Sequence, residues 1–172
     1  MRLNQISSIT ARGIILSTFI CIASHLTFAQ KAERFFNKSD LMLVGSYHYP
    51  EQWPKENLER DLKKMASLGF DFTHYGEFAW AAMEPEEGKY DFGWLDEAVK
   101  VAEKNHLKVV MCTPSPTPPV WLTKKYPEVL MVNEEGRTMQ HGARQHISWS
   151  SKKYREYVEK IVTVMAKRYG NN

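Results

Sequence analysis

Three short strand-like segments alternate with two amphipathic helical patterns in the middle of the chain, and this order restricts the fold more than any other feature. The strand-like segments, 41–45, 70–75 and 108–112, are rich in apolar, aromatic or β-branched residues. An order of strand, helix, strand, helix, strand is typical of a parallel sheet with right-handed crossovers. The sequence therefore predicts an α/β protein.

Each predicted helix has its apolar residues on one face. A first helix after Pro54 is expected to end at Gly69, and a second is expected to begin at Asp91. Four prolines in 113–119 predict a stiff, extended loop, which a short helix over 120–125 follows. A long last helix is expected to begin at Ser150 or Ser151. The apolar faces of the three longer helices comprise Leu58, Leu62 and Met65, then Leu95, Ala98, Val99 and Ala102, and finally Tyr154, Val158, Ile161, Val162 and Met165.

Two architectures share this order of elements, an open doubly wound sheet and a (β/α)8 barrel. A doubly wound nucleotide-binding domain has a glycine-rich turn after its first strand. Here the first strand leads into 47–51, which reads Tyr-His-Tyr-Pro-Glu. The sequence therefore favours the (β/α)8 TIM barrel over the doubly wound sheet.

The N-terminus has the layout of a secretory signal peptide. Residues 1–29 contain two arginines and no acidic residue, and an uncharged, mostly apolar run over 13–24 precedes small residues at the cleavage site. A transmembrane anchor is the competing interpretation, but this run is shorter than the roughly 20 residues that span a bilayer. A lipid anchor at Cys21 lacks the small residues that precede a lipidated cysteine. We expect cleavage after Ala29, export to the periplasm or the outside of the cell, and no stable membrane anchor.

The exported chain is then expected to begin with a polar lead-in over 30–40. Residues 41–172 follow as about three βα units of a barrel.

Candidate binding residues follow the predicted strands, where a (β/α)8 protein builds its site. Glu77 comes directly after the second strand, and its carboxylate is suited to accept hydrogen bonds from sugar hydroxyls; a helix start or a salt bridge is the alternative role. Trp80 and Trp121 lie beside the loops and offer aromatic faces to the apolar side of a sugar ring, unless they only pack. Arg144 lies on the loop before the last helix, where a guanidinium could bind a hydroxyl or orient a carboxylate.

Several other classes of function lack support in the sequence. A formal net charge of +3 without any Lys/Arg-rich run gives no reason to expect a nucleic-acid partner. There is neither a glycine-rich phosphate loop nor a Gly-x-Ser-x-Gly nucleophile motif. His141 and His146 are the only candidates for a metal site, and no HExxH or CxxC pattern accompanies them. We therefore expect no metal and no cofactor.

Five groups of residues together resemble the start of a glycoside hydrolase family 42 β-galactosidase. The resemblance extends over almost the whole predicted exported chain, with the motifs in the order and spacing of the family. The groups are YPEQWP at 49–54, GEFAW at 76–80 with EP at 84–85, WLD at 94–96, the proline-rich 113–119 with WL at 121–122, and GAR at 142–144.

This resemblance implies a (β/α)8 barrel that hydrolyses terminal non-reducing β-D-galactosides, including galacto-oligosaccharides, with retention. Such enzymes use one glutamate as acid/base and a second as nucleophile, about 5 Å apart. The resemblance places Glu77 on the family's galactose-contacting glutamate and Arg144 on its substrate-binding arginine. It places both catalytic glutamates beyond residue 172, so we expect none in this chain. A homo-oligomeric full-length enzyme remains open.

Two residues depart from the family pattern. Ser148 stands where many members have the first cysteine of a zinc cluster, so the resemblance implies no zinc here. His74 stands where an arginine usually precedes the Gly-Glu turn, which leaves the local charge pairing in question.

Two alternatives to a part of a β-galactosidase stay open. The chain could be a non-catalytic carbohydrate-binding or interaction module built from a partial barrel, in which case the edge of the third strand must be covered. A second polypeptide could instead supply the remaining strands.

We predict that the chain without residues 1–29 does not hydrolyse β-galactosides, because it is expected to lack both catalytic carboxylates. Assay of the purified chain on a chromogenic β-galactoside tests this. Clear turnover that Glu77→Gln abolishes would contradict the prediction.

Overall fold

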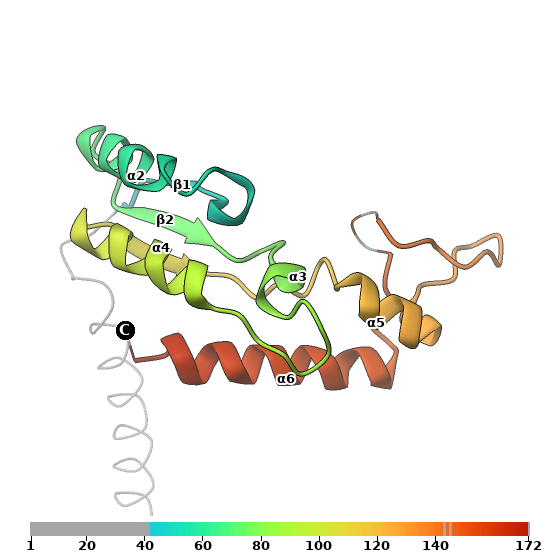
Figure 1. The fold of residues 1–172 in the computed structure, drawn as a ribbon. Coiled ribbons are helices and arrows are strands. Elements are labelled where there is room, and N and C mark those ends of the chain that lie inside the picture. The colour runs from blue at the N-terminus through green and yellow to red at the C-terminus, as the bar shows by residue number, and fades with distance from the viewer. Residues whose placement is uncertain (1–41, 143, 145, 172) are drawn as a thin grey trace, which may run out of the picture. The chain divides into compact units, whose positions relative to one another are not determined.

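A three-stranded parallel sheet organises the part of the chain that the structure describes. The structure is a computed structural model that describes residues 42–142, 144 and 146–171. Strand β2 lies between β1 and β3, and Tyr47, His74 and Val110 share one register position across the sheet. The strands are β1 (Gly45–Tyr47), β2 (Phe72–Tyr75) and β3 (Lys108–Met111). The predicted parallel α/β order is confirmed (Figure 1).

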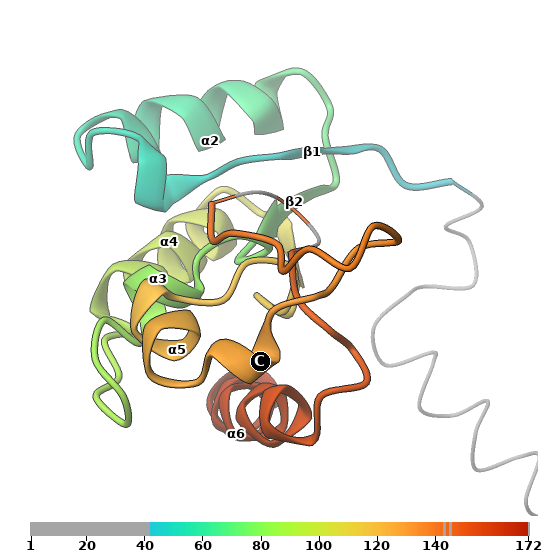
Figure 2. The ribbon, with the colours of Figure 1, turned by 90° about the vertical axis from the view of Figure 1, so that its right-hand side faces the viewer.

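Three longer helices, α2, α4 and α6, accompany the sheet (Figures 1 and 2). Along the chain α2 follows β1, α4 follows β2 and α6 follows β3. Their bounds are α2 (Asn57–Ser67), α4 (Gly93–Lys104) and α6 (Lys152–Tyr169). The shorter helices are η1 (Pro50–Gln52), α3 (Trp80–Met83), α5 (Val120–Lys125) and η2 (Pro127–Val129). The short helix predicted over 120–125 is therefore confirmed as α5, and 113–119 contains neither helix nor strand, as its prolines require.

The helix boundaries follow from local chemistry. Gly69 comes just after α2 with a φ of 82°, a left-handed conformation that favours glycine. The Ser151 hydroxyl accepts a hydrogen bond from the backbone N–H of Tyr154 at 3.2 Å and caps α6, as the sequence predicts. At α4 the cap position is Phe92, one residue later than expected, although the Asp91 carboxylate still accepts from the first helical N–H, that of Gly93, at 3.0 Å.

The first strand differs from its prediction, because pairing begins at Gly45 and not before it. Val44 lies at the margin, where its N–H donates to the Asp71 carboxylate at 2.8 Å and its carbonyl accepts from the Asp71 N–H at 2.7 Å. Gly45 then passes so close to Phe72 that a Cβ would lie 2.5 Å from the Phe72 ring. The strand continues from there to Tyr47, so it extends into the segment for which the sequence predicted a loop.

The helices cover one face of the sheet. Thr73 and Tyr75 of β2 are fully buried on this face, and the Tyr75 hydroxyl donates to the Ala98 carbonyl of α4 at 3.3 Å. On the opposite face Tyr47 is 60% exposed and Val110 is 41% exposed. His74, between them, is buried against Tyr47 and Cys112, so within the described residues the opposite face is covered only at the central strand.

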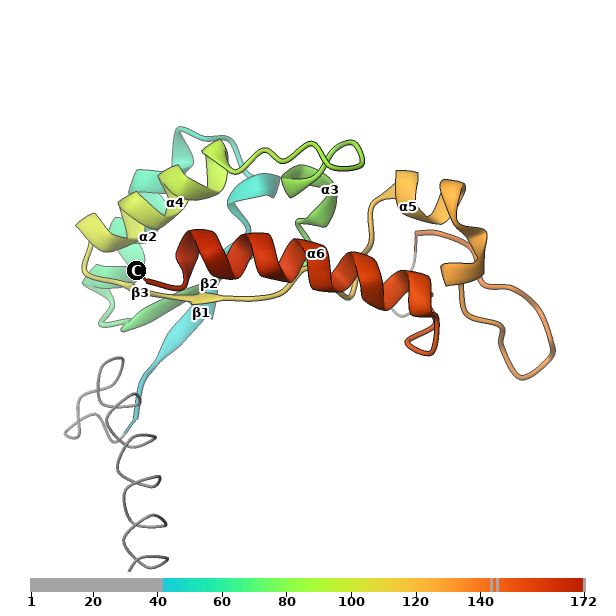
Figure 3. The same ribbon diagram turned by 90° about the horizontal axis from the view of Figure 1, so that it is seen from below.

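The segments after the strands gather at the end of the sheet to which the strands point. Figure 3 shows α3 and α5 at this end, with the loop between α5 and α6 extending beyond them. Single antiparallel bridges, Leu130 with Ile147 and Val132 with Thr138, hold that loop together.

The predicted signal peptide (1–29) and lead-in (30–40) lie outside the described residues. Among the residues described, no helix combines the length and the apolar character that crossing a membrane requires.

Candidate functional site

The turn after β2 sets the direction of the first candidate residue, Glu77. Gly76 has a φ of 93°, and a Cβ there would lie 3.0 Å from the Cys112 carbonyl oxygen and 3.1 Å from the Met83 side chain. Only glycine fits such a left-handed and crowded position. The Ala79 N–H donates to the Gly76 carbonyl at 3.2 Å and closes the turn, which leaves Glu77 at the carboxyl end of the sheet.

Glu77 has neither of the structural roles that the sequence left open. Its carboxylate makes no hydrogen bond or ion pair within the described residues, and α3 begins only at Trp80, with Ala79 as its cap residue. Burial raises the pKa of Tyr49, and the negative charge of Glu77 raises it further while Arg144 opposes this. The Glu77 side chain is therefore half-buried and has no hydrogen-bond or ion-pair partner among the described residues. It lies close enough to Tyr49, which follows β1, to raise the pKa of that residue.

Arg144 reaches the same place from the loop before α6. Its guanidinium carbon lies 4.2 Å from the centre of the Phe78 ring. The Phe78 ring in turn stacks on Tyr49, with centroids 5.9 Å apart and planes 25° apart. The structure thus brings two of the predicted binding residues, Glu77 and Arg144, to one site at the carboxyl end of the sheet.

The two predicted tryptophans are instead both hydrogen-bonded to the buried residue Glu84, one to its side chain and one to its backbone. Trp80 has no exposed surface, and its indole N–H donates to the Glu84 carboxylate at 2.8 Å. The indole N–H of Trp121 donates to the backbone carbonyl of Glu84 at 2.9 Å, and its ring meets the edge of Tyr157 at 5.6 Å. The structure corrects the expectation for Trp80, because a fully enclosed ring has no face to offer a sugar. Trp121 is half-buried and packs at the same anchor.

Sequence reasoning missed the partners of these residues. Tyr49 and Phe78 belong to the family motifs, but nothing in their spacing along the sequence predicts that their rings stack. Glu84 likewise belongs to a motif, and its position directly before a proline in an aromatic segment could have indicated a structural role for it. His74 lies beside Cys112, with its Nε2 against the thiol sulfur, so its neighbour there is a thiol and not a carboxylate.

The two histidines considered for a metal lie together but lack further ligands. The rings of His141 and His146 are 5.1 Å apart, and His141 Nδ1 lies 3.0 Å from the Thr123 hydroxyl. Burial lowers the pKa of His141, and His146 lowers it further. Across residues 42–142, 144 and 146–171 there is no group of three or more His, Cys, Asp or Glu side chains placed to hold a metal ion.

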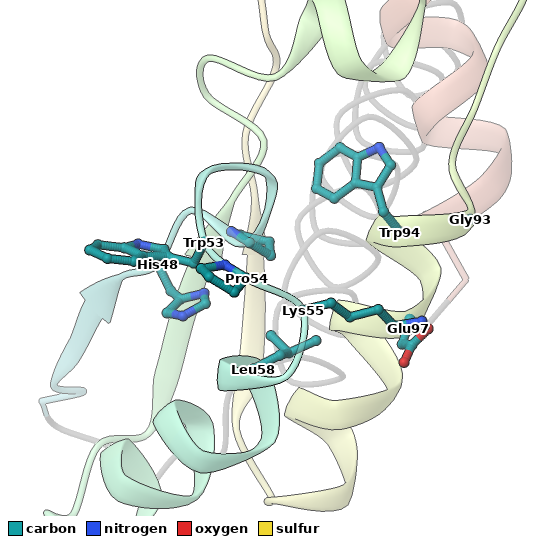
Figure 4. Close-up of a pocket in the computed structure, with 9 residues that line it drawn as sticks. His48, Trp53, Pro54, Lys55, Leu58, Gly93, Trp94 and Glu97 are labelled. Carbon is teal, nitrogen blue, oxygen red and sulfur yellow. Dashed lines mark ion pairs between the residues drawn. The ribbon is translucent and has the colours of Figure 1, made fainter.

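A separate pocket of about 370 Å³ lies between the segment after β1 and the start of α4. Figure 4 shows Trp94 and Glu97 on α4, with Lys55 from the facing segment paired to Glu97. Its lining also includes His48 and Trp53, but none of the four predicted binding residues. This pocket is therefore not the site that the sequence predicts.

Parallel βα units with polar and aromatic side chains at the carboxyl ends of the strands are typical of the α/β proteins that build their site there, a class to which the (β/α)8 barrels belong. The comparisons with known proteins identify the family. The family model described as β-galactosidase, glycoside hydrolase family 42, matches residues 47–172. The chain belongs to this family.

Individual relatives agree with this assignment. A β-galactosidase from Thermus thermophilus is 48% identical over 128 residues, which cover 74% of this chain and 20% of the relative. The crystal structure of a β-galactosidase from Marinomonas ef1 matches with a TM-score of 0.73 and 40% identity, over 75% of this chain and 20% of that one. The β-galactosidase from Halorubrum lacusprofundi matches with a TM-score of 0.74 and 38% identity, over 76% and 20%. The chain thus spans about a fifth of the length of these relatives.

The Glu84 anchor makes a testable prediction about stability. Glu84→Ala removes the acceptor of the Trp80 indole N–H and of the Gly88 backbone N–H. The buried indole N–H of Trp80, left unpaired, costs about 1–3 kcal/mol, and the lost bond from the exposed Gly88 adds about 1 kcal/mol, so we expect the free energy of unfolding to fall by about 2–4 kcal/mol. Urea unfolding followed by tryptophan fluorescence measures it. Glu86→Ala is the matched control, because Glu86 is exposed and its pair with Lys89 is worth about 0–1 kcal/mol. Equal losses in the two variants would contradict the anchoring role.

Proposed function

We propose that this chain supplies part of the galactose-binding site of a β-galactosidase that hydrolyses terminal non-reducing β-D-galactosides, including galacto-oligosaccharides. The observation that carries the proposal is the meeting of Glu77 and Arg144 beside the Tyr49–Phe78 stack. Membership of the family and the printed names of the relatives support the substrate class.

The chemistry of the site suits a sugar. A carboxylate accepts hydrogen bonds from ring hydroxyls, and a guanidinium donates several N–H groups in one plane to hydroxyl oxygens. The neighbouring rings of Tyr49 and Phe78 offer apolar surface to the C–H side of the pyranose. Glu77 and Arg144 therefore bind and orient the galactose.

Bond cleavage in this proposal follows the retaining double displacement. One glutamate protonates the glycosidic oxygen while a second attacks the anomeric carbon, and water then releases the sugar from the covalent intermediate. We assign neither catalytic role to a residue of this chain. Its contribution is to hold the sugar ring so that the scissile bond lies between the two carboxylates.

Replacing Glu77 with glutamine tests the binding role. Glutamine keeps the size of the side chain but loses the charge, and hydrogen bonds to charged groups are worth about 1.5–3 kcal/mol. In the full-length protein we therefore expect kcat/KM on a chromogenic β-galactoside to fall about 10- to 100-fold. Glu135→Gln, at an exposed position of the loop before α6, serves as the control and should retain activity. Unchanged kcat/KM in Glu77→Gln would contradict the proposal.

We also propose that the protein is exported and that its signal peptide is removed after Ala29. The basic start, the apolar run over 13–24 and the small residues before the cleavage site support this. N-terminal sequencing of the protein recovered from the periplasm or the medium should then begin at Gln30. Recovery of the unprocessed chain in the cytoplasm alone would contradict it.

A further inference from the structure

Phe78 belongs to a column of flat groups, each in contact with the next, at the carboxyl end of the sheet. The Arg144 guanidinium lies over one side of the Phe78 ring at 4.2 Å, and Tyr49 stacks on the ring at 5.9 Å. Tyr49 is also stacked with Tyr47 of β1, with centroids 6.3 Å apart and planes 21° apart. The column therefore connects the sheet to an arginine on a loop distant in sequence.

This stacking leaves the hydrogen-bonding groups of Arg144 available. A guanidinium stacks on an aromatic ring through its face, whereas its five N–H donors point outward in its plane. Arg144 is exposed, and within the described part of the chain its guanidinium makes no ion pair and no hydrogen bond. The Phe78 ring is therefore the contact that restricts the orientation of this long and otherwise flexible side chain.

The position of Phe78 itself is tied to that of Glu77. The two residues are consecutive in the turn that Gly76 opens and that the bond from the Ala79 N–H to the Gly76 carbonyl closes. One turn thus presents the carboxylate and also the ring on which the guanidinium rests. The separation between the Glu77 carboxylate and the Arg144 guanidinium is consequently set through Phe78.

We propose that Phe78 is a positioning residue, whose ring holds Arg144 in the orientation that lets it share one galactose ring with Glu77. This role rests on the proposed galactose-binding function of Glu77 and Arg144. Phe78 acts through Arg144 and does not itself supply a polar contact to the sugar.

A double-mutant cycle in the full-length protein tests the dependence on Arg144. Phe78→Leu keeps an apolar side chain but removes the aromatic face, and we expect it to raise KM for a chromogenic β-galactoside about 2- to 5-fold, with kcat nearly unchanged. In the Arg144→Ala background the same change should alter KM less than about 2-fold, since the interaction is already lost. Phe78→Trp should restore the wild-type KM. Equal effects of Phe78→Leu in both backgrounds would overturn the proposal.

A second measurement needs no substrate and so separates this proposal from the proposed function. Phenylglyoxal modifies accessible guanidinium groups, and peptide mapping by mass spectrometry reports the rate at Arg144. We expect this rate to rise about 2- to 5-fold in Phe78→Leu, because the ring no longer covers one face of the guanidinium or restricts its orientation. An unchanged rate would overturn the positioning role, whereas a raised rate in a protein without β-galactosidase activity would overturn only the proposed function.

The chain offers a matched control at a second Arg–Phe pair. The Arg168 guanidinium lies 5.4 Å from the centre of the Phe92 ring, where α4 meets α6 and away from the Glu77 site. Phe92→Leu makes the same chemical change in the core, so it should lower stability without changing KM or the modification rate at Arg144. A change in either quantity as large as that in Phe78→Leu would show that the effect is a general loss of packing and would contradict the proposal.

Discussion

Because β1, β2 and β3 pair in parallel, the segments that follow them all come out at the same edge of the sheet. Tyr49 follows β1, Glu77 follows β2 and Cys112 follows β3. Burial and the charge of Glu77 raise the pKa of Tyr49 and also that of Cys112, so residues after β1 and β3 both lie within electrostatic reach of Glu77. The proposed binding residues are therefore brought to one end of the sheet by the direction of the strands.

The same parallel pairing explains the asymmetry of the packing. Parallel sheets in α/β proteins are normally buried on both faces. Here the helices cover the face that carries Thr73 and Tyr75, while Tyr47 and Val110 on the other face remain exposed in the described residues. In a (β/α)8 barrel that second face lines the interior, which side chains from the other strands fill. The chain spans about a fifth of the length of its relatives, and the face that is exposed in it is the one that such a barrel buries.

Much of this arrangement could be predicted from the sequence, because it depends on local pattern. Helical spacing located the buried Leu58, Leu62 and Met65 of α2, and the strand order predicted the parallel sheet. Glu77 was a candidate because it directly follows a predicted strand, and Arg144 because it lies on the loop before the last helix; each also lies within a family motif. The stack of Arg144 on Phe78 could not be predicted, since it joins two loops far apart in the sequence and has no periodicity. The sequence left open whether Trp80 packs or binds, because an aromatic residue beside a loop has the same local pattern in both cases, and the structure buries it.

The GEFAW motif shows why the two roles have to be separated residue by residue. After Gly76 turns the chain, Glu77 and Phe78 stay half-buried at the mouth of the sheet, and the helix that begins two residues later carries Trp80 into the core. Trp80 is fixed there by the Glu84 carboxylate, whereas Phe78 is in contact with Arg144. The end of the motif, at Trp80, is thus held in the core, while its middle, at Glu77 and Phe78, places a charge and a ring at the carboxyl end of the sheet. Within this five-residue segment, Trp80 therefore belongs to the core, whereas Glu77 and Phe78 remain at the carboxyl end of the sheet.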